Sequence, residues 1–185
     1  MPETLFSLAE QIRRCTECRL WKSRTLAVPG EGPTDAKMMF IGEAPGAEED
    51  RQGLPFIGQS GKFLTGMLNK IGIDRKTVFI TGAVKCHPLA SRIPKKNEWE
   101  TCKDLWLNQQ VEIIKPSLIV LLGSTAIQSS LGEKKDLLKV HGTIVVKDGQ
   151  KYFLTYHPAA AMRFLKIGKL MEKDFVKLKK IISVF

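Results

Sequence analysis

Two spacings of apolar residues alternate along the chain and predict its secondary structure. Short, nearly continuous apolar runs, typical of buried strands, occupy residues 36–41, 78–84 and 118–122. Apolar residues at intervals of three and four, typical of helices, fill most of the chain between and around these runs. The predicted helices cover residues 4–14, 61–71, 97–114, 124–131 and 165–182.

The ends of two elements carry their own signals. Asn97 is suited to cap a helix, and Glu100 three residues later completes a capping-box pattern. Residues 144–146 and 152–155 alternate between apolar and polar on either side of Asp148-Gly149, which favours a tight turn. These signals predict a helix that begins at residue 97 and a β-hairpin late in the chain.

Strands separated by helices predict an α/β fold. We expect a three-layer α/β/α sandwich with a mostly parallel central sheet covered on both faces. The 185 residues contain no repeat or long linker, so they fit a single domain over 1–185. Ligands of such sheets bind beyond the carboxyl ends of the strands. This rule brings together the loops at 42–60, 82–95 and 156–163.

The balance of charge points to an anionic partner. Lys and Arg number 29 against 19 Asp and Glu, which gives a net charge of +10. Such an excess favours DNA, RNA or an acidic membrane face, although a generally basic surface has the same composition. The lysines between residues 165 and 180 fit a solvated helix face better than a DNA groove.

Nothing in the sequence predicts a membrane protein. The longest apolar run, 118–122, has only the length of a strand. The first four residues, 1–4, lack the basic and apolar regions of a signal peptide. We therefore expect a protein of the cytoplasm, where thiols stay reduced, so the four cysteines need an explanation other than disulfides. We also expect a monomer.

The cysteine spacing fits a metal centre. Cys15 and Cys18 form a C-x2-C pair, while Cys86 and Cys102 have fifteen residues between them. Four thiolates can hold a tetrahedral zinc ion or a [4Fe–4S] cluster. Because zinc sites usually have two compact pairs and only one pair here is compact, the spacing modestly favours a cluster. Four unligated buried cysteines are the remaining alternative.

Three further segments fall in the three loops. They are Gly42-Glu43-Ala44-Pro45-Gly46 with residues 48–50, residues 53–58 with Gly61, and His157-Pro158-Ala159-Ala160. Together with Val84-Lys85-Cys86 and the cysteine spacing, they resemble the family 4 (iron–sulfur) uracil-DNA glycosylases over residues 15–163. Each segment alone is a weak signal, but all of them in this order are a strong one.

The resemblance implies a DNA base-excision repair enzyme that flips uracil out of DNA and hydrolyses its N-glycosidic bond. It also implies a structural [4Fe–4S] cluster held by Cys15, Cys18, Cys86 and Cys102. The expected substrate-binding residues are Gly42, Ala44, Pro45, Gly46, Phe56, Gly82, Met162 and Arg163.

Four residues carry the chemistry that the resemblance implies. Glu43, with Glu49 nearby, positions the attacking water, and a carboxylate near the sugar also favours a cationic transition state. Phe56 stacks on the flipped base. His157 faces the departing base and, as a neutral donor, stabilises its developing negative charge. The plain alternatives are a solvated acidic loop, a core phenylalanine and an ordinary loop histidine.

Gly82 is the main departure from the family pattern, which usually has asparagine at this position. The absence of the asparagine puts base selectivity in question, so a glycosylase of broader specificity, which also accepts hypoxanthine or xanthine, is one alternative. A non-catalytic iron–sulfur protein that binds nucleic acid or transfers electrons is another. A nucleotide-binding enzyme is a weaker alternative, because neither G-x-G-x-x-G nor G-x4-G-K-[ST] occurs.

Other positions yield weaker expectations. In one variant of the family, a histidine in the corresponding loop forms a covalent adduct with DNA. Residues 88–97 contain no histidine, so we expect the enzyme to release its product and turn over. Ala161 or Met162 could fill the gap that the flipped base leaves. His87 and His141 are expected to be structural.

Overall fold

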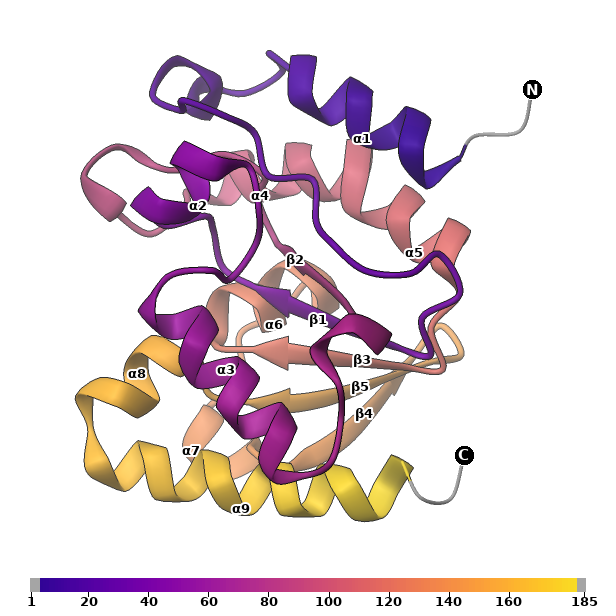
Figure 1. The fold of residues 1–185 in the computed structure, drawn as a ribbon, viewed down its shortest axis with the longest axis vertical. Coiled ribbons are helices and arrows are strands. Elements are labelled where there is room, and N and C mark those ends of the chain that lie inside the picture. Colours follow the sequence, from indigo (N-terminus) through magenta and orange to yellow (C-terminus); the bar gives the residue numbers. More distant parts are fainter. Residues whose placement is uncertain (1–3, 183–185) are drawn as a thin grey trace.

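The computed structural model, which describes residues 4–182, contains a five-stranded sheet in the order β2-β1-β3-β5-β4 (Figure 1). All neighbouring strands are parallel except β4 and β5, which form an antiparallel hairpin at one edge. The strands are β1 (Met38–Gly42), β2 (Phe79–Gly82), β3 (Leu118–Leu122), β4 (Thr143–Lys147) and β5 (Gln150–Thr155).

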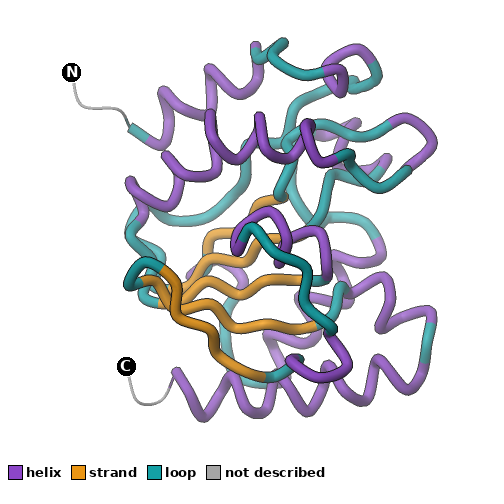
Figure 2. The backbone as a smooth tube through the Cα atoms, turned by 180° about the vertical axis from the view of Figure 1, so that it is seen from behind, coloured by secondary structure: helices purple, strands orange, loops and turns teal. Residues whose placement is uncertain are grey.

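Helices cover both faces of the sheet because successive strand side chains point to opposite faces. Phe40 belongs to a core shared with α3 (Gln59–Lys70), α8 (Pro158–Arg163) and α9 (Leu165–Ile182). Its neighbours Met39 and Ile41 belong to the core of the other face, seen from behind in Figure 2. The helices of that face are α5 (Asn108–Ile114), α6 (Ser124–Leu131) and α7 (Leu137–Val140), with α1 (Leu5–Arg14) packed outside α5. The predicted three-layer α/β/α sandwich is confirmed.

The hairpin follows from its turn residues. Asp148 and Gly149 have φ angles of +50° and +78°. This pair of left-handed residues matches the twist of the flanking strands in a two-residue turn. The antiparallel pairing of β4 with β5 was therefore predictable from a short segment of sequence.

The helix predicted at 97–114 begins earlier and is less regular than expected. It starts as α4 (Lys96–Cys102), and Lys95 rather than Asn97 is the capping residue. Glu98 accepts from the Lys95 N–H at 2.7 Å and is held in place by Arg92, so Glu98 takes the role expected of Glu100. A π-helical segment, Lys103–Leu107, then joins α4 to α5. Such segments widen a helix and are frequent beside functional sites.

Several short elements lie in regions predicted as loops. The helices are α2 (Ala47–Gln52), α7 and α8, and the 3-10 turns span Arg19–Lys22, Arg75–Thr77 and Leu89–Ser91. Two of the helices have signals in the sequence: acidic residues in the first turn of α2, and a proline as the first residue of α8. None of the helices in residues 4–182 is long and apolar enough to cross a membrane.

Candidate active site

A cavity of about 130 Å³ lies at the carboxyl ends of the parallel strands. An apolar cavity of about 150 Å³ is known to take up a benzene ring, so this one is large enough for a small aromatic ring. Its lining brings together seven of the residues that the sequence predicted, from all three expected loops. They are Ala44, Pro45, Gly46, Glu49, Phe56, Gly82 and His157.

Backbone hydrogen bonds join the loops that follow β1 and β2. The Ala83 N–H donates to the Gly42 carbonyl at 2.9 Å, and the Val84 N–H donates to the Glu43 carbonyl at 3.2 Å. The parallel pairing of the two strands therefore continues past their ends. This continuation places Gly82 and the segment at 44–46 on the same wall of the cavity.

His157 caps helix α8 and lines the cavity from the third loop. Its Nδ1 accepts the Ala159 N–H at 3.2 Å, so in the neutral ring the proton sits on Nε2. Burial lowers the pKa of His157 from 6.5 to about 4, and the Glu49 carboxylate opposes this shift. The imidazole is therefore neutral at physiological pH and offers one N–H donor from Nε2.

Phe56 and Gly42 pack together at the base of the cavity. A β-carbon at Gly42 would lie 2.4 Å from the Phe56 ring, so only glycine allows the ring to lie there. The centroids of the Phe56 and His157 rings are 5.9 Å apart, with 37° between the planes. The geometry thus sets an aromatic face beside an N–H donor.

The Glu49 carboxylate joins two loops around the cavity. One oxygen accepts from the N–H groups of Ile57 and Gly58 at 2.9 and 2.8 Å, and the other accepts from Gly46 at 3.0 Å. Glu49 therefore has a structural function in addition to lining the cavity. A carboxylate has about four acceptor positions, so this one keeps capacity for a further donor.

Four of the predicted residues do not line this cavity. Gly42 lies beneath the Phe56 ring, and the Glu43 carboxylate accepts a hydrogen bond from Thr125. Met162 and Arg163 border a separate surface groove beside α9, where Met162 is 45% exposed. Their proposed roles in substrate binding stay predictions.

The structure adds three residues that the sequence analysis did not assign to the site. Val28, Pro55 and Ser60 complete the cavity lining. Pro55 belongs to the segment at 53–58 and Ser60 lies just after it, so both could have been inferred from that segment, whereas no pattern marked Val28. Two histidines expected to be structural have such contacts: His87 Nδ1 donates to the Pro45 carbonyl at 2.7 Å, and His141 contacts the buried Asp174.

The four cysteines line a second, small cavity together with Ile12, Lys85, Thr101 and Trp106. All four are free thiols, and Cys86 and Cys102 are buried. N–H donors face two of the sulfurs. Trp106 Nε1 donates to Cys15 Sγ at 3.3 Å, and the Arg24 guanidinium donates to Cys86 Sγ at 3.0 Å.

Charge in this region is unusual. Burial raises the pKa of Cys18 and Cys86, and it raises the pKa of Cys102 to about 12. Burial also lowers the pKa of Lys85 to about 8, and the neighbouring thiols oppose that shift. Its ammonium donates to Thr81, the Gly82 carbonyl and Gln110 at 2.6–2.9 Å. Lys85 thus connects the cysteine cavity to the wall of the first cavity.

Comparison with known proteins identifies the family. Residues 29–179 match the model of the uracil DNA glycosylase superfamily. A type-4 uracil-DNA glycosylase of Sulfurisphaera tokodaii is 43% identical, with 97% of this chain and 85% of that protein aligned. The type-4 enzyme of Saccharolobus solfataricus is 42% identical (98% and 88% aligned), and that of Thermotoga maritima is 38% identical (98% and 96%). The chain therefore belongs to the uracil DNA glycosylase superfamily and, within it, to the type-4 uracil-DNA glycosylases.

Proposed function

We propose that this protein hydrolyses the N-glycosidic bond of uracil in DNA as a base-excision repair enzyme. The observation that carries the proposal is a ring-sized cavity in which Phe56 lies beside a neutral His157 with its proton on Nε2. A flipped base can stack on Phe56 while the His157 N–H donates to a base carbonyl. That donor stabilises the negative charge that the uracil ring gains as the bond breaks.

The carboxylates supply the complementary charge. We assign Glu43 to orient the attacking water, with the Thr125 hydroxyl fixing its carboxylate. Glu49 lines the cavity and favours the positive charge that develops on the sugar.

The direct test of the proposed function is incubation of the purified protein with a single-uracil oligonucleotide. Release of free uracil and an abasic site supports the proposal, and an intact base contradicts it.

We further propose that Cys15, Cys18, Cys86 and Cys102 hold a [4Fe–4S] cluster. The four thiols line one small cavity, although they come from three separate parts of the chain. Only Cys15 and Cys18 form a compact pair in the sequence, and this spacing favours a cluster over zinc. The N–H donors to sulfur and the Lys85 ammonium suit bound thiolates. The cluster would supply a structural cross-link and no step of the hydrolysis.

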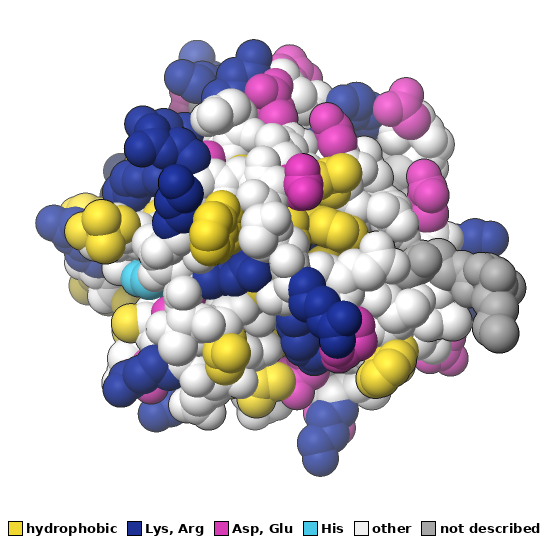
Figure 3. Space-filling model, turned by 90° about the horizontal axis from the view of Figure 1, so that it is seen from above, with side chains coloured by type: hydrophobic (Ala, Val, Ile, Leu, Met, Phe, Trp, Pro, Cys, Tyr) yellow, Lys and Arg dark blue, Asp and Glu magenta, His cyan; other side chains and the backbone are white. Residues whose placement is uncertain are grey.

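DNA is the expected partner, and the protein should act on it as a monomer. Figure 3 shows Lys and Arg side chains gathered along one side of the face seen from above, beside a histidine. If about five phosphates are contacted, the logarithm of the affinity should fall with the logarithm of salt concentration at a slope of about −4 to −5. Fluorescence anisotropy of a labelled duplex between low and moderate salt measures that slope, and a flat response would remove DNA as a partner.

Gly82 supports a second candidate function, a glycosylase with a broader range of deaminated bases. The residue lines the cavity without a side chain, and its φ lies outside the left-handed region. An asparagine amide could pair with uracil, whereas glycine leaves space there. However, a β-carbon at Gly82 would lie 2.7 Å from the Val84 carbonyl, so a side chain requires the turn at 82–84 to move.

We expect the native protein to remove hypoxanthine or xanthine as well as uracil. Gly82→Asn should lower activity on the larger bases at least about tenfold more than activity on uracil. Parallel assays of the three oligonucleotides measure the change. Gly82→Ala is the control, since it meets the Val84 carbonyl without adding an amide. Strict uracil specificity in the native protein, unchanged by Gly82→Asn, would show that this explanation of Gly82 is wrong.

A further inference from the structure

Phe56 has a backbone conformation that a phenylalanine rarely adopts. Its φ angle is +51°, in the left-handed region that favours glycine. A bulky residue stays in this region only when its surroundings hold it there. The same residue provides the aromatic face of the cavity, so whatever holds its backbone also sets the position of that face.

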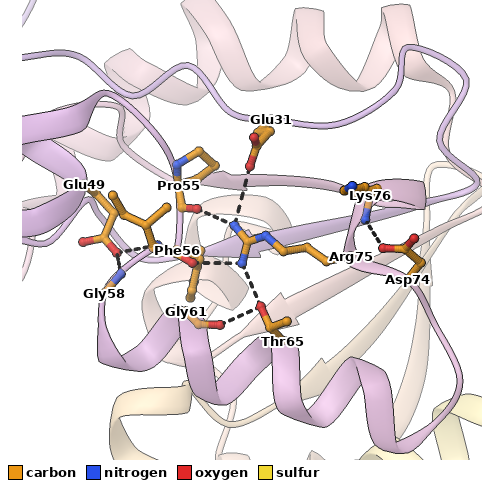
Figure 4. Close-up of polar contacts among 11 residues, drawn as sticks. Glu31, Glu49, Pro55, Phe56, Gly58, Gly61, Thr65, Asp74, Arg75 and Lys76 are labelled. Atoms are coloured by element: carbon orange, nitrogen blue, oxygen red, sulfur yellow. Dashed lines mark hydrogen bonds and ion pairs between the residues drawn. The ribbon is translucent and has the colours of Figure 1, made fainter.

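Arg75 holds the carbonyl side of this strained segment (Figure 4). Its guanidinium donates to the Phe56 carbonyl at 2.8 Å and to the Pro55 carbonyl at 2.5 Å. It also donates to the Thr65 hydroxyl at 3.2 Å, and the Glu31 carboxylate lies 3.7 Å away. The side chain is only 19% exposed. A planar guanidinium can bridge two neighbouring carbonyls in this manner, and a lysine ammonium is not preorganised to do so.

Helix α3 and Glu49 hold the other sides of the segment. A β-carbon at Gly61 would lie 1.7 Å from the Phe56 carbonyl oxygen, so the start of α3 presses against that peptide. Thr65, one turn further along α3, donates to the Gly61 carbonyl while accepting from Arg75. Glu49 accepts from the two N–H groups that follow Phe56. Phe56 is thus held by Arg75 on one side and by Glu49 and the start of α3 on the others. Glu49 and the start of α3 also contribute to the cavity lining, whereas Arg75 does not.

We propose that Arg75 is a positioning residue for base recognition. By binding the carbonyls of Pro55 and Phe56, it keeps Phe56 in the left-handed conformation that lays its ring on Gly42, facing the cavity. Arg75 does not line the base cavity, and it acts on base recognition through the backbone of Pro55 and Phe56. The role in base recognition rests on the proposed glycosylase function, whereas the clamp itself is a property of the fold.

A double-mutant cycle on the single-turnover rate with uracil DNA tests the proposal. Arg75→Gln should lower the rate about tenfold when Phe56 is present and less than about twofold in a Phe56→Ala background, because contacting residues are coupled. Arg75→Lys should lower the rate nearly as much as Arg75→Gln, since lysine keeps the positive charge but lacks the planar pair of N–H donors that binds two carbonyls. Arg51→Gln, which removes an exposed arginine from α2, should leave the rate unchanged. Equal losses in both backgrounds would overturn the proposal, because a general stabilising role is independent of Phe56.

Native-state proteolysis supplies a readout that needs no glycosylase activity. Chymotrypsin cleavage after Phe56, mapped by mass spectrometry, should be at least about tenfold faster in Arg75→Gln and Arg75→Lys, with other sites unaffected. Unchanged cleavage in folded Arg75→Lys overturns the clamp, even if Arg75→Gln fails to fold. If the native protein leaves uracil in DNA, the proposed function fails, and the proteolysis result still decides whether Arg75 holds Phe56.

Discussion

Replacing His157 with alanine should lower kcat by about 10²–10³ and leave DNA affinity nearly unchanged. The Nε2–H donor acts mainly on the negative charge that appears in the transition state, so its loss affects rate more than binding. Single-turnover kinetics and anisotropy titrations on the same uracil duplex separate the two quantities. His157→Gln is the matched control, because its amide can restore a donor and should recover part of the rate. Equal losses in rate and affinity would instead assign His157 to DNA positioning.

The pH profile gives an independent check on the same residue. Burial holds the pKa of His157 near 4, so the neutral, active imidazole persists at pH values well below 6.5, the usual pKa of a histidine. We therefore expect that protonation of His157 causes no fall in rate around pH 6.5, so the native protein and His157→Gln should have profiles of the same shape there.

The stability of the fold depends on the same pKa shift. Between about pH 6.5 and 4 the unfolded chain binds a proton that the folded chain does not, so the free energy of unfolding falls as pH falls through this window.

Cys102→Ser is the second change for which we expect a large effect. Cys102 is a buried thiol at the end of α4, and a cluster there would link α1, the loop after β2 and α4. Removing a cross-link that closes a long loop costs about 4 kcal/mol, which corresponds to about 8–16 °C in Tm for a domain of this size. Iron content, absorbance near 400 nm (from iron–thiolate bonds) and a melting curve measure the outcome.

The control for this variant comes from the same cavity wall. Thr101→Ser removes one methyl group beside the cysteines and should keep full iron content and nearly native Tm. Residual uracil release by Cys102→Ser at low temperature should exceed that of His157→Ala, because the proposed cluster would take no part in the hydrolysis. Unchanged iron and unchanged melting in Cys102→Ser would reject the cysteine as a ligand.

The sequence predicted the sheet and the location of the cavity well. Strand β3 is a continuous apolar run because both of its faces are buried, and this pattern identifies a central strand without further information. The parallel arrangement then required the loops after β1, β2 and β5 to meet. Ala44, Gly82 and His157 do line one cavity as a result.

The contacts that refine the site could not be predicted in the same way. Arg75 reaches Phe56 across nineteen positions of sequence, and no local spacing marks a guanidinium that binds two backbone carbonyls. Similarly, α4 begins at Lys96 because Arg92 holds the Glu98 carboxylate at the first turn of the helix. This contact between side chains overrides the local preference of Asn97 for the capping position. Tertiary contacts decided both cases.

The strand order also determines when the cavity can form during folding. Among the strands that the structure describes, only the β4–β5 hairpin pairs strands that are close in sequence, whereas β1 must pair with β2 and β3 from far downstream. Distant parallel pairing is slow because the chain loses loop entropy before it gains the contacts. The hairpin can therefore form early, but Phe56 and His157 face each other only after β1, β3 and β5 have assembled. A chain in which these strands have not yet paired lacks the aromatic face beside its donor, so on the proposed function it cannot recognise a base.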